Sequence, residues 1–102
     1  MPVVDEALVY LSTAILTAKN RGAVVLKIIH GYGSNGSPSK IKVAVRKELA
    51  ELKRTRQITD FISGEDFNCF NERAMKFYAA CTDVAKDHDW VSPNRGITII
   101  LL

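Results

Sequence analysis

The stretch that most constrains the fold of this chain is a short apolar run that leads into a glycine-rich turn and then into a basic segment. Residues 24–30 are rich in β-branched side chains and too few for a stable helix, so they predict a buried strand. Three glycines, Gly31, Gly33 and Gly36, follow, and helical spacing resumes at Pro38. A strand that ends in a histidine and a glycine turn at a helix N-terminus offers backbone N–H groups to an anion. We therefore expect a phosphate-binding site here.

The rest of the chain alternates between helical and strand patterns. Gly22 suits the C-terminal end of the first helix, and Ser37 and Asn71 suit the N-caps of the second and third. The order helix–strand, repeated three times, predicts an α/β fold: a two-layer or three-layer sandwich with a mixed, mostly parallel sheet of three to four strands. The predicted elements are helices over 6–20, from 38 to about 53 and from 71 to about 85, and strands over 24–30, 58–63 and 97–102.

Length and composition predict a single cytoplasmic domain over residues 1–102. The longest apolar runs, 23–29 and 97–102, are far shorter than the roughly 18 residues that a membrane span requires. The N-terminus is acidic and does not look like a signal peptide. Two cysteines, Cys69 and Cys81, do not make a disulfide framework, so we expect reduced thiols.

Charge is distributed unevenly along the chain. Residues 31–59 carry seven basic and two acidic side chains, whereas residues 60–90 carry three basic and seven acidic ones. The positive charge therefore lies on and after the glycine turn, which favours a polyanion docking on one face. A solvated helix face is the alternative reading of the same pattern.

The glycine turn matches one nucleotide-binding motif in part and does not match another. Gly31, Gly33 and Gly36 match the dinucleotide fingerprint G-x-G-x-x-G, but Asp60, the acid in the next strand, is predicted inside that strand rather than at its tip. The Walker A motif is excluded because Gly36 is followed by Ser37 and Pro38 instead of a lysine and a hydroxyl residue.

Two segments of the chain resemble the small MutS-related (Smr) domain family. They are the strand ending in His30-Gly31-Tyr32-Gly33 and the terminal strand that follows Gly96 and includes Thr98. The resemblance covers about two thirds of the chain. It implies an α/β sandwich with a four-stranded sheet, similar to the C-terminal domain of bacterial translation initiation factor three. It also implies binding to DNA or RNA, and endonuclease activity in some members.

The chain departs from the Smr pattern in three places. The N-terminal strand with its Leu-Asp-x-His-Gly motif has no counterpart here, which weakens the expectation of nuclease activity. Asn94 and Arg95 stand in the turn before the last strand, where the family has glycines. Residues 65–93 are interpreted as an insertion with an extra helix, which we expect to serve a protein partner.

The candidate site comprises the segment from His30 through the glycine turn to Lys40 and the turn over residues 94–98, which are expected to converge. His30 is a candidate general acid or base, or a phosphate ligand, and its alternative role is to cap the strand end. No metal or cofactor is expected, because Cys69, Cys81 and His88 lack metal-ligand spacing. The predicted phosphate-binding residues are Gly31, Tyr32, Gly33, Ser34, Gly36, Ser37, Ser39, Lys40, Arg46, Lys47 and Arg95.

Four functions follow from these patterns. The leading one is binding of structured or branched DNA or RNA through the His-Gly-x-Gly turn and the basic helix. The second is an Smr-type endonuclease with His30 as its acid or base. The third is a nucleotide-binding module, and the fourth is an adaptor that works through residues 65–93. The sequence leaves the oligomeric state open, although an uncovered sheet edge would invite pairing between chains.

Overall fold

The chain folds into a small sheet with helices on both faces. The computed structural model describes residues 2–31 and 40–102. Within these ranges, none of the helices combines the length and apolarity that crossing a membrane requires. The elements in chain order are α1 (Pro2–Asn20), β1 (Val25–Ile29), α2 (Lys40–Arg54), β2 (Asp60–Ser63), α3 (Glu72–Ala80), the short 3₁₀ helix η1 (Thr82–Lys86), α4 (His88–Val91) and β3 (Ile97–Leu101).

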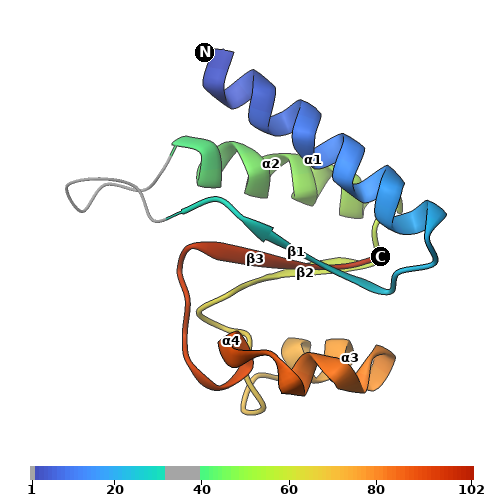
Figure 1. Cartoon of the computed structure of the whole chain (residues 1–102), viewed down its shortest axis with the longest axis vertical. Coiled ribbons are helices and arrows are strands. Elements are labelled where there is room, and N and C mark those ends of the chain that lie inside the picture. Colours follow the sequence, from blue (N-terminus) through green and yellow to red (C-terminus); the bar gives the residue numbers. More distant parts are fainter. Residues whose placement is uncertain (1, 32–39) are drawn as a thin grey trace.

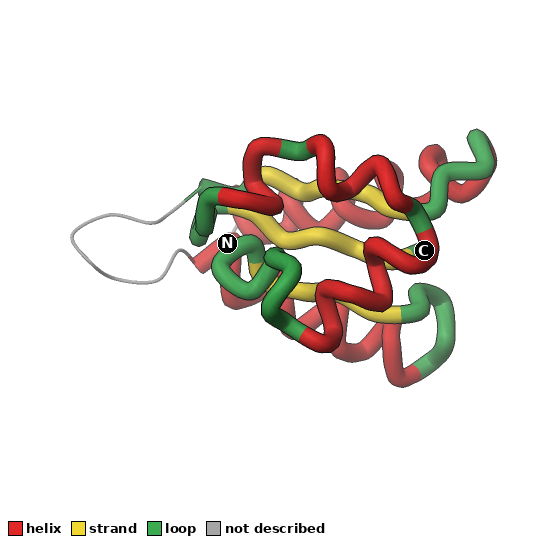
Figure 2. The backbone as a smooth tube through the Cα atoms, turned by 90° about the horizontal axis from the view of Figure 1, so that it is seen from below, coloured by secondary structure: helices red, strands yellow, loops and turns green. Residues whose placement is uncertain are grey.

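The architecture has three layers. Helices α1 and α2 cover one face of the sheet, and α3 and α4 cover the other (Figure 1). The described strands form one sheet in the order β1-β3-β2, seen side by side in Figure 2. Ile28 and Ser63 both lie opposite Thr98 in the register, so β3 is the central strand. The prediction of an α/β sandwich is therefore confirmed at the level of its layers.

The expectation of a mostly parallel sheet is wrong. Both pairs of neighbouring strands, β1 with β3 and β2 with β3, are antiparallel. Only β1 and β2, which α2 connects, run in the same direction, and β3 separates them. After β2 the chain runs out along α3 and back through η1 and α4, so β3 starts at the same end of the sheet where β2 stops (Figure 1). Because this connection returns to the end of the sheet that it left, β3 runs antiparallel to β2.

The two faces of β3 bury different halves of the core. Ile97, Ile99 and Leu101 pack with α3, η1 and α4, while Ile100 packs with α1 and α2. This alternation is the period of two that every strand imposes. The segment 65–93 therefore supplies the whole second helical layer, without which one face of β3 would be exposed to water.

Local capping explains most of the helix ends. Gly22 has a φ of 75°, and Ala23 N donates to Ala18 O at 2.9 Å, as in a Schellman C-cap. The Asn71 side chain accepts from the N–H groups of Arg73 and Ala74, which confirms it as an N-cap. The third helix ends earlier than predicted, because Cys81 is extended and η1 follows.

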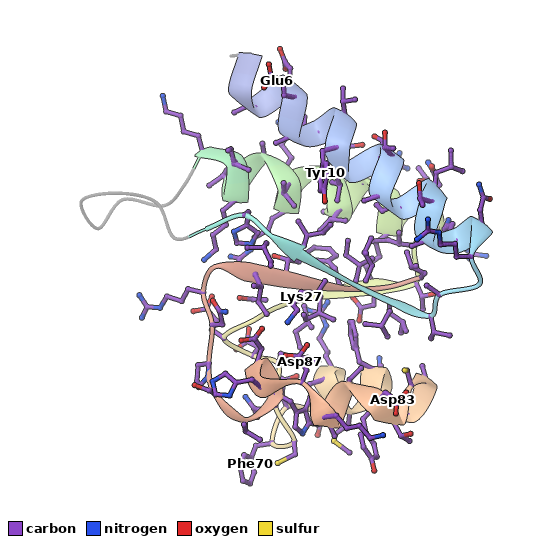
Figure 3. All side chains as sticks on the ribbon, in the orientation of Figure 1. Glu6, Tyr10, Lys27, Phe70, Asp83 and Asp87 are labelled. Atoms are coloured by element: carbon purple, nitrogen blue, oxygen red, sulfur yellow. The ribbon has the colours of Figure 1, made fainter. Side chains whose placement is uncertain are left out.

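A half-buried lysine links α4 to the sheet through two ion pairs. The Lys27 ammonium lies 2.8 Å from Asp87 and 2.8 Å from Asp89. Figure 3 shows Lys27 between the sheet and Asp87. The hydrogen bonds that the Lys27 ammonium donates to these two carboxylates raise its pKa. The short helix α4 is thus held against β1 by Asp89 within it and by Asp87 at its N-cap.

Candidate functional site

The candidate site lies where β1 and β2 end and β3 begins. The N–H groups of His30 and Gly31 both donate to Gly96 O, at 2.9 and 3.0 Å. Gly31 has a φ of 77°, a conformation that glycine adopts without strain. The start of the predicted anion-binding turn is therefore tied to the residue before β3, and the Gly31 N–H already has a carbonyl partner.

The His30 ring is held at both nitrogens. Its Nδ1 lies 2.9 Å from Gly31 O, and its Nε2 lies 2.9 Å from the hydroxyl of Thr98. Because a carbonyl can only accept, Nδ1 carries the proton and Nε2 accepts from Thr98. Burial lowers the pKa of His30, and the positive charges of Lys42 and Arg46 lower it further. The imidazole is therefore neutral at pH 7.

Basic side chains from two parts of the chain lie at this end of the sheet, and two of them, Lys42 and Arg46, act electrostatically on His30. From α2, Arg46 donates to the Ser63 hydroxyl at 2.7 Å and lies 3.6 Å from Glu65. From the turn before β3, Arg95 lies 3.9 Å from the other oxygen of Glu65. We call His30, Lys42, Arg46 and Arg95 the basic edge.

Glu65 is the acidic partner of the basic edge. A hydrogen bond from the Ser63 hydroxyl, at 2.8 Å, is the main reason that the pKa of Glu65 is lowered, and the charges of Lys42 and Arg46 add to it. The carboxylate is thus ionised at neutral pH. It occupies a position that an oxyanion of a ligand would share.

The structure brings together only some of the predicted site residues. His30, Gly31, Arg46 and Arg95 meet at the basic edge. Lys47 follows Arg46 in α2 and is exposed, on the side of the helix away from buried Val45 and Leu49. Lys40 is the exposed first residue of α2. Outside the described residues lie Tyr32, Gly33, Ser34, Gly36, Ser37 and Ser39.

Three polar residues of the site were not among the predicted ligands. Ser63 and Thr98 are register neighbours on β2 and β3, and Glu65 follows β2 after Gly64. Only the pairing of distant strands places them beside His30. A hydroxyl at the last position of one strand and near the start of another is too common in sequences to signal a site.

Asp60 does not serve as a ribose-binding acid in this structure. It is the first residue of β2, at the end of the strand away from His30. Its carboxylate is buried and accepts hydrogen bonds from Arg73, while Lys53 lies 3.0 Å away. Burial alone would raise the pKa of Asp60, but the bonds from Arg73, Lys53 and the Phe61 N–H outweigh it and lower the pKa. Lys53, another basic residue of α2, is therefore engaged in an ion pair within the chain.

Metal ligands are not grouped in the described part of the chain. Residues 2–31 and 40–102 contain no cluster of three or more His, Cys, Asp or Glu side chains that could hold a metal ion. Cys69 and Cys81 are free thiols.

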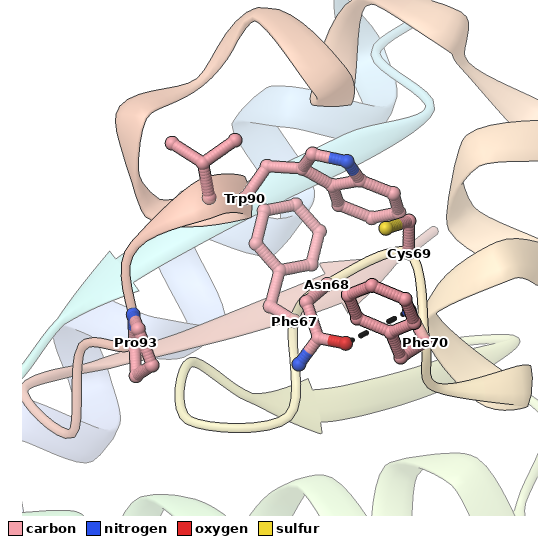
Figure 4. A pocket seen from close by; sticks show the side chains of 7 residues that line it. Phe67, Asn68, Cys69, Phe70, Trp90 and Pro93 are labelled. Atoms are coloured by element: carbon pink, nitrogen blue, oxygen red, sulfur yellow. Dashed lines mark hydrogen bonds between the residues drawn. The ribbon is translucent and has the colours of Figure 1, made fainter.

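A second concave feature lies on the opposite layer, between the loop before α3 and helix α4. It is a pocket of about 520 Å³ beside the edge-to-face pair of Phe67 and Trp90, whose ring centroids are 4.9 Å apart (Figure 4). Phe70, which also lines it, is 93% exposed. The prediction that residues 65–93 bind a protein partner stays a prediction, and this pocket is the part of the segment that could serve it.

Comparisons with known proteins do not add to this description. A scan against protein-family models, a search of curated proteins and a search of solved structures each return no match. The chain is a three-layer α/β protein with basic side chains near one end of its three-stranded antiparallel sheet.

Proposed function

We propose that this chain binds nucleic acid through backbone phosphates at the basic edge. The observation that carries the proposal is a group of three cationic side chains from two segments near the end of the sheet where β2 stops and β3 starts: Lys42 and Arg46 from α2, and Arg95 from the turn before β3. Phosphate contacts of this kind give affinity that depends strongly on salt and weakly on sequence.

Glu65 holds the two arginines only loosely. Its contacts with Arg46 and Arg95 are 3.6 and 3.9 Å long, and all three side chains are at least one-third exposed. Exposed ion pairs of this type contribute about 0–1 kcal/mol. A phosphate group, with more charge and more acceptor oxygens, would compete effectively for both guanidinium groups.

The hydrogen bonds of the His30 ring favour binding of nucleic acid over its cleavage. A general base needs a free lone pair within reach of the proton that it removes. Here the Nε2 lone pair accepts from Thr98, and the Nδ1 proton is used by Gly31 O. We therefore assign His30 to positioning the edge and sensing a bound anion. The endonuclease remains the second candidate, which would require Thr98 to release the ring.

We also propose that the chain is a divergent member of the Smr family, with a sandwich similar to that of the C-terminal domain of translation initiation factor three. The support is that the two segments carrying the resemblance touch each other. Gly96 O accepts from the N–H groups of His30 and Gly31, and Thr98 bonds the His30 ring.

The proposal is tested by fluorescence anisotropy with labelled hairpin RNA, branched DNA and duplex DNA at about 50 and 200 mM salt. The double variant Arg46→Gln/Arg95→Gln should weaken binding and reduce the slope of log K against log salt by about 1.4 to 1.8, since two phosphate contacts are lost. The matched control is Lys76→Gln/Lys86→Gln, which removes the same charge from α3 and η1. It should bind nearly as wild type.

The pKa of His30, measured by NMR, gives a second test of the proposal. A phosphate next to the imidazole favours its protonated form, so nucleic acid should raise the pKa of His30 in an NMR titration. Equal loss of affinity in both double variants, or binding that is insensitive to salt, would refute the proposal.

A further inference from the structure

The outer edge of β1 is an open hydrogen-bonding strand. Leu102 N donates to Val24 O and His30 N donates to Gly96 O, so the even-numbered residues of this segment bond the terminal strand. In an antiparallel ladder, the alternate residues Val25, Lys27 and Ile29 then direct their N–H and C=O groups outward. In the described part of the chain, β1 has a neighbouring strand on one side only. Ile29, at its end, is 77% exposed.

A shallow groove of about 450 Å³ runs beside this edge, between α1 and β1. It is lined mainly by small side chains that let another backbone approach closely. Tyr10, at one end of the groove, is 68% exposed, and Figure 3 shows it on α1. The lining residues are Tyr10, Thr13, Ala14, Thr17, Ala18, Arg21, Ala23 and Leu26.

The groove face of α1 is complementary to itself in charge. Tyr10, Thr13, Thr17 and Arg21 line the groove at spacings of three and four, Arg21 being the first residue after α1, and Glu6 extends the same spacing toward the start of the helix. Its acidic residue lies at the start and its basic residue at the end, each about 11 Å from a midpoint between Thr13 and Ala14. An antiparallel copy of the same helix would therefore place each acid opposite the other chain's arginine.

We propose that a second copy of this chain docks here, with β1 pairing antiparallel to β1 and α1 packing antiparallel against α1. A two-fold axis makes both contacts at once, because Ala14, Ala18 and Leu26 line the same groove and so bring the middle of α1 over the middle of β1. The result is a continuous sheet of six strands. It leaves the two basic edges at opposite ends, so the interface does not use them.

Lys27 does not oppose this pairing. A lysine on an edge strand commonly discourages strand addition. Here its ammonium is held on the α4 side by Asp87 and Asp89, each at 2.8 Å, so its charge is compensated within the chain.

Analytical ultracentrifugation of a charge-swap series tests the proposal. Wild type should sediment as a dimer, Arg21→Glu should raise the dissociation constant at least about tenfold, and Glu6→Arg/Arg21→Glu should restore dimerisation because both pairs re-form with reversed sign. The control Lys76→Glu makes the same charge change on α3 and should leave the dimer intact.

Hydrogen exchange reports on the strand edge independently. Amide protection of Val25, Lys27 and Ile29 should increase with protein concentration in wild type and not in Arg21→Glu. A monomeric wild type at several hundred micromolar, a swap that fails to restore the dimer, or a dimer without this protection would each overturn the proposal.

Discussion

Two glycines at element ends are required for different physical reasons. A Cβ on Gly64, which follows β2, would lie 2.1 Å from Asn94 O and 2.3 Å from Ile97 Cγ1. Gly22, after α1, has open space around that position but a φ of 75°. The first glycine permits close approach of two chain segments, and the second permits a left-handed turn.

Gly64→Ala should therefore lower the free energy of unfolding by at least about 2 kcal/mol, since backbone and a buried isoleucine must both move. Gly22→Ala, the same chemical change, should cost about 1 kcal/mol from its backbone conformation alone. Urea unfolding monitored by circular dichroism measures both. A Gly64 variant no less stable than the Gly22 variant would contradict the steric argument.

At the same scale, sequence reasoning located His30 and the turn over residues 94–98 beside it, but not the individual side-chain contacts of the site. Its place between a β-branched run and a glycine turn was readable from the chain. Its partner Thr98 is 68 residues away, and the two Arg46 contacts depend on how α2 crosses the sheet. No local pattern carries such information.

Among the elements, the prediction for α3 is confirmed at its N-terminal boundary and wrong at its C-terminal boundary. Asn71 provides side-chain acceptors for two N–H groups, a local interaction that sequence reveals. The apolar positions Phe77, Cys81 and Val84 continue the helical spacing, yet Cys81 is extended and η1 follows. A 3₁₀ turn keeps nearly the same spacing of buried residues, so periodicity does not reveal the break.

Asn71→Ala should destabilise the protein by about 1 kcal/mol, because the first turn of α3 loses its cap. Asn71→Asp keeps an acceptor and adds a charge that the helix N-terminus favours, so it should be near wild type. Thermal unfolding compares the three proteins. An alanine variant as stable as the aspartate variant would show that the cap contributes little.

For the molecule as a whole, Asp60 links all three layers. It lies on β2, while its partner Arg73 is on α3 and its partner Lys53 is on α2. The pKa of this buried carboxyl is lowered, so its contribution is present above the ordinary value of 3.8 and is lost as the pH falls through the folded-state value.

Asp60→Asn should reduce the free energy of unfolding at pH 7 by about 1–3 kcal/mol, between the ranges for exposed and for fully buried ion pairs, because Asp60 is buried but Lys53 and Arg73 are half exposed. The difference from wild type should shrink as the pH falls below 3.8. Urea unfolding from pH 7 to pH 2.5 measures this convergence. A difference that is constant with pH would exclude the ionised carboxylate as its source.

The amino-acid sequence determined the positions of the helices and strands, the caps at Gly22 and Asn71, and the place of the histidine–glycine turn, because these depend on residues within a few positions of one another. The antiparallel sheet, the role of segment 65–93 as a covering layer, and the gathering of Arg46, Arg95 and Glu65 beside His30 were decided by tertiary structure. These features follow from the path of the chain after β2, which returns to the end of the sheet where β2 stops. That path is set by how apolar faces far apart in sequence bury one another, and spacing along the chain does not encode it.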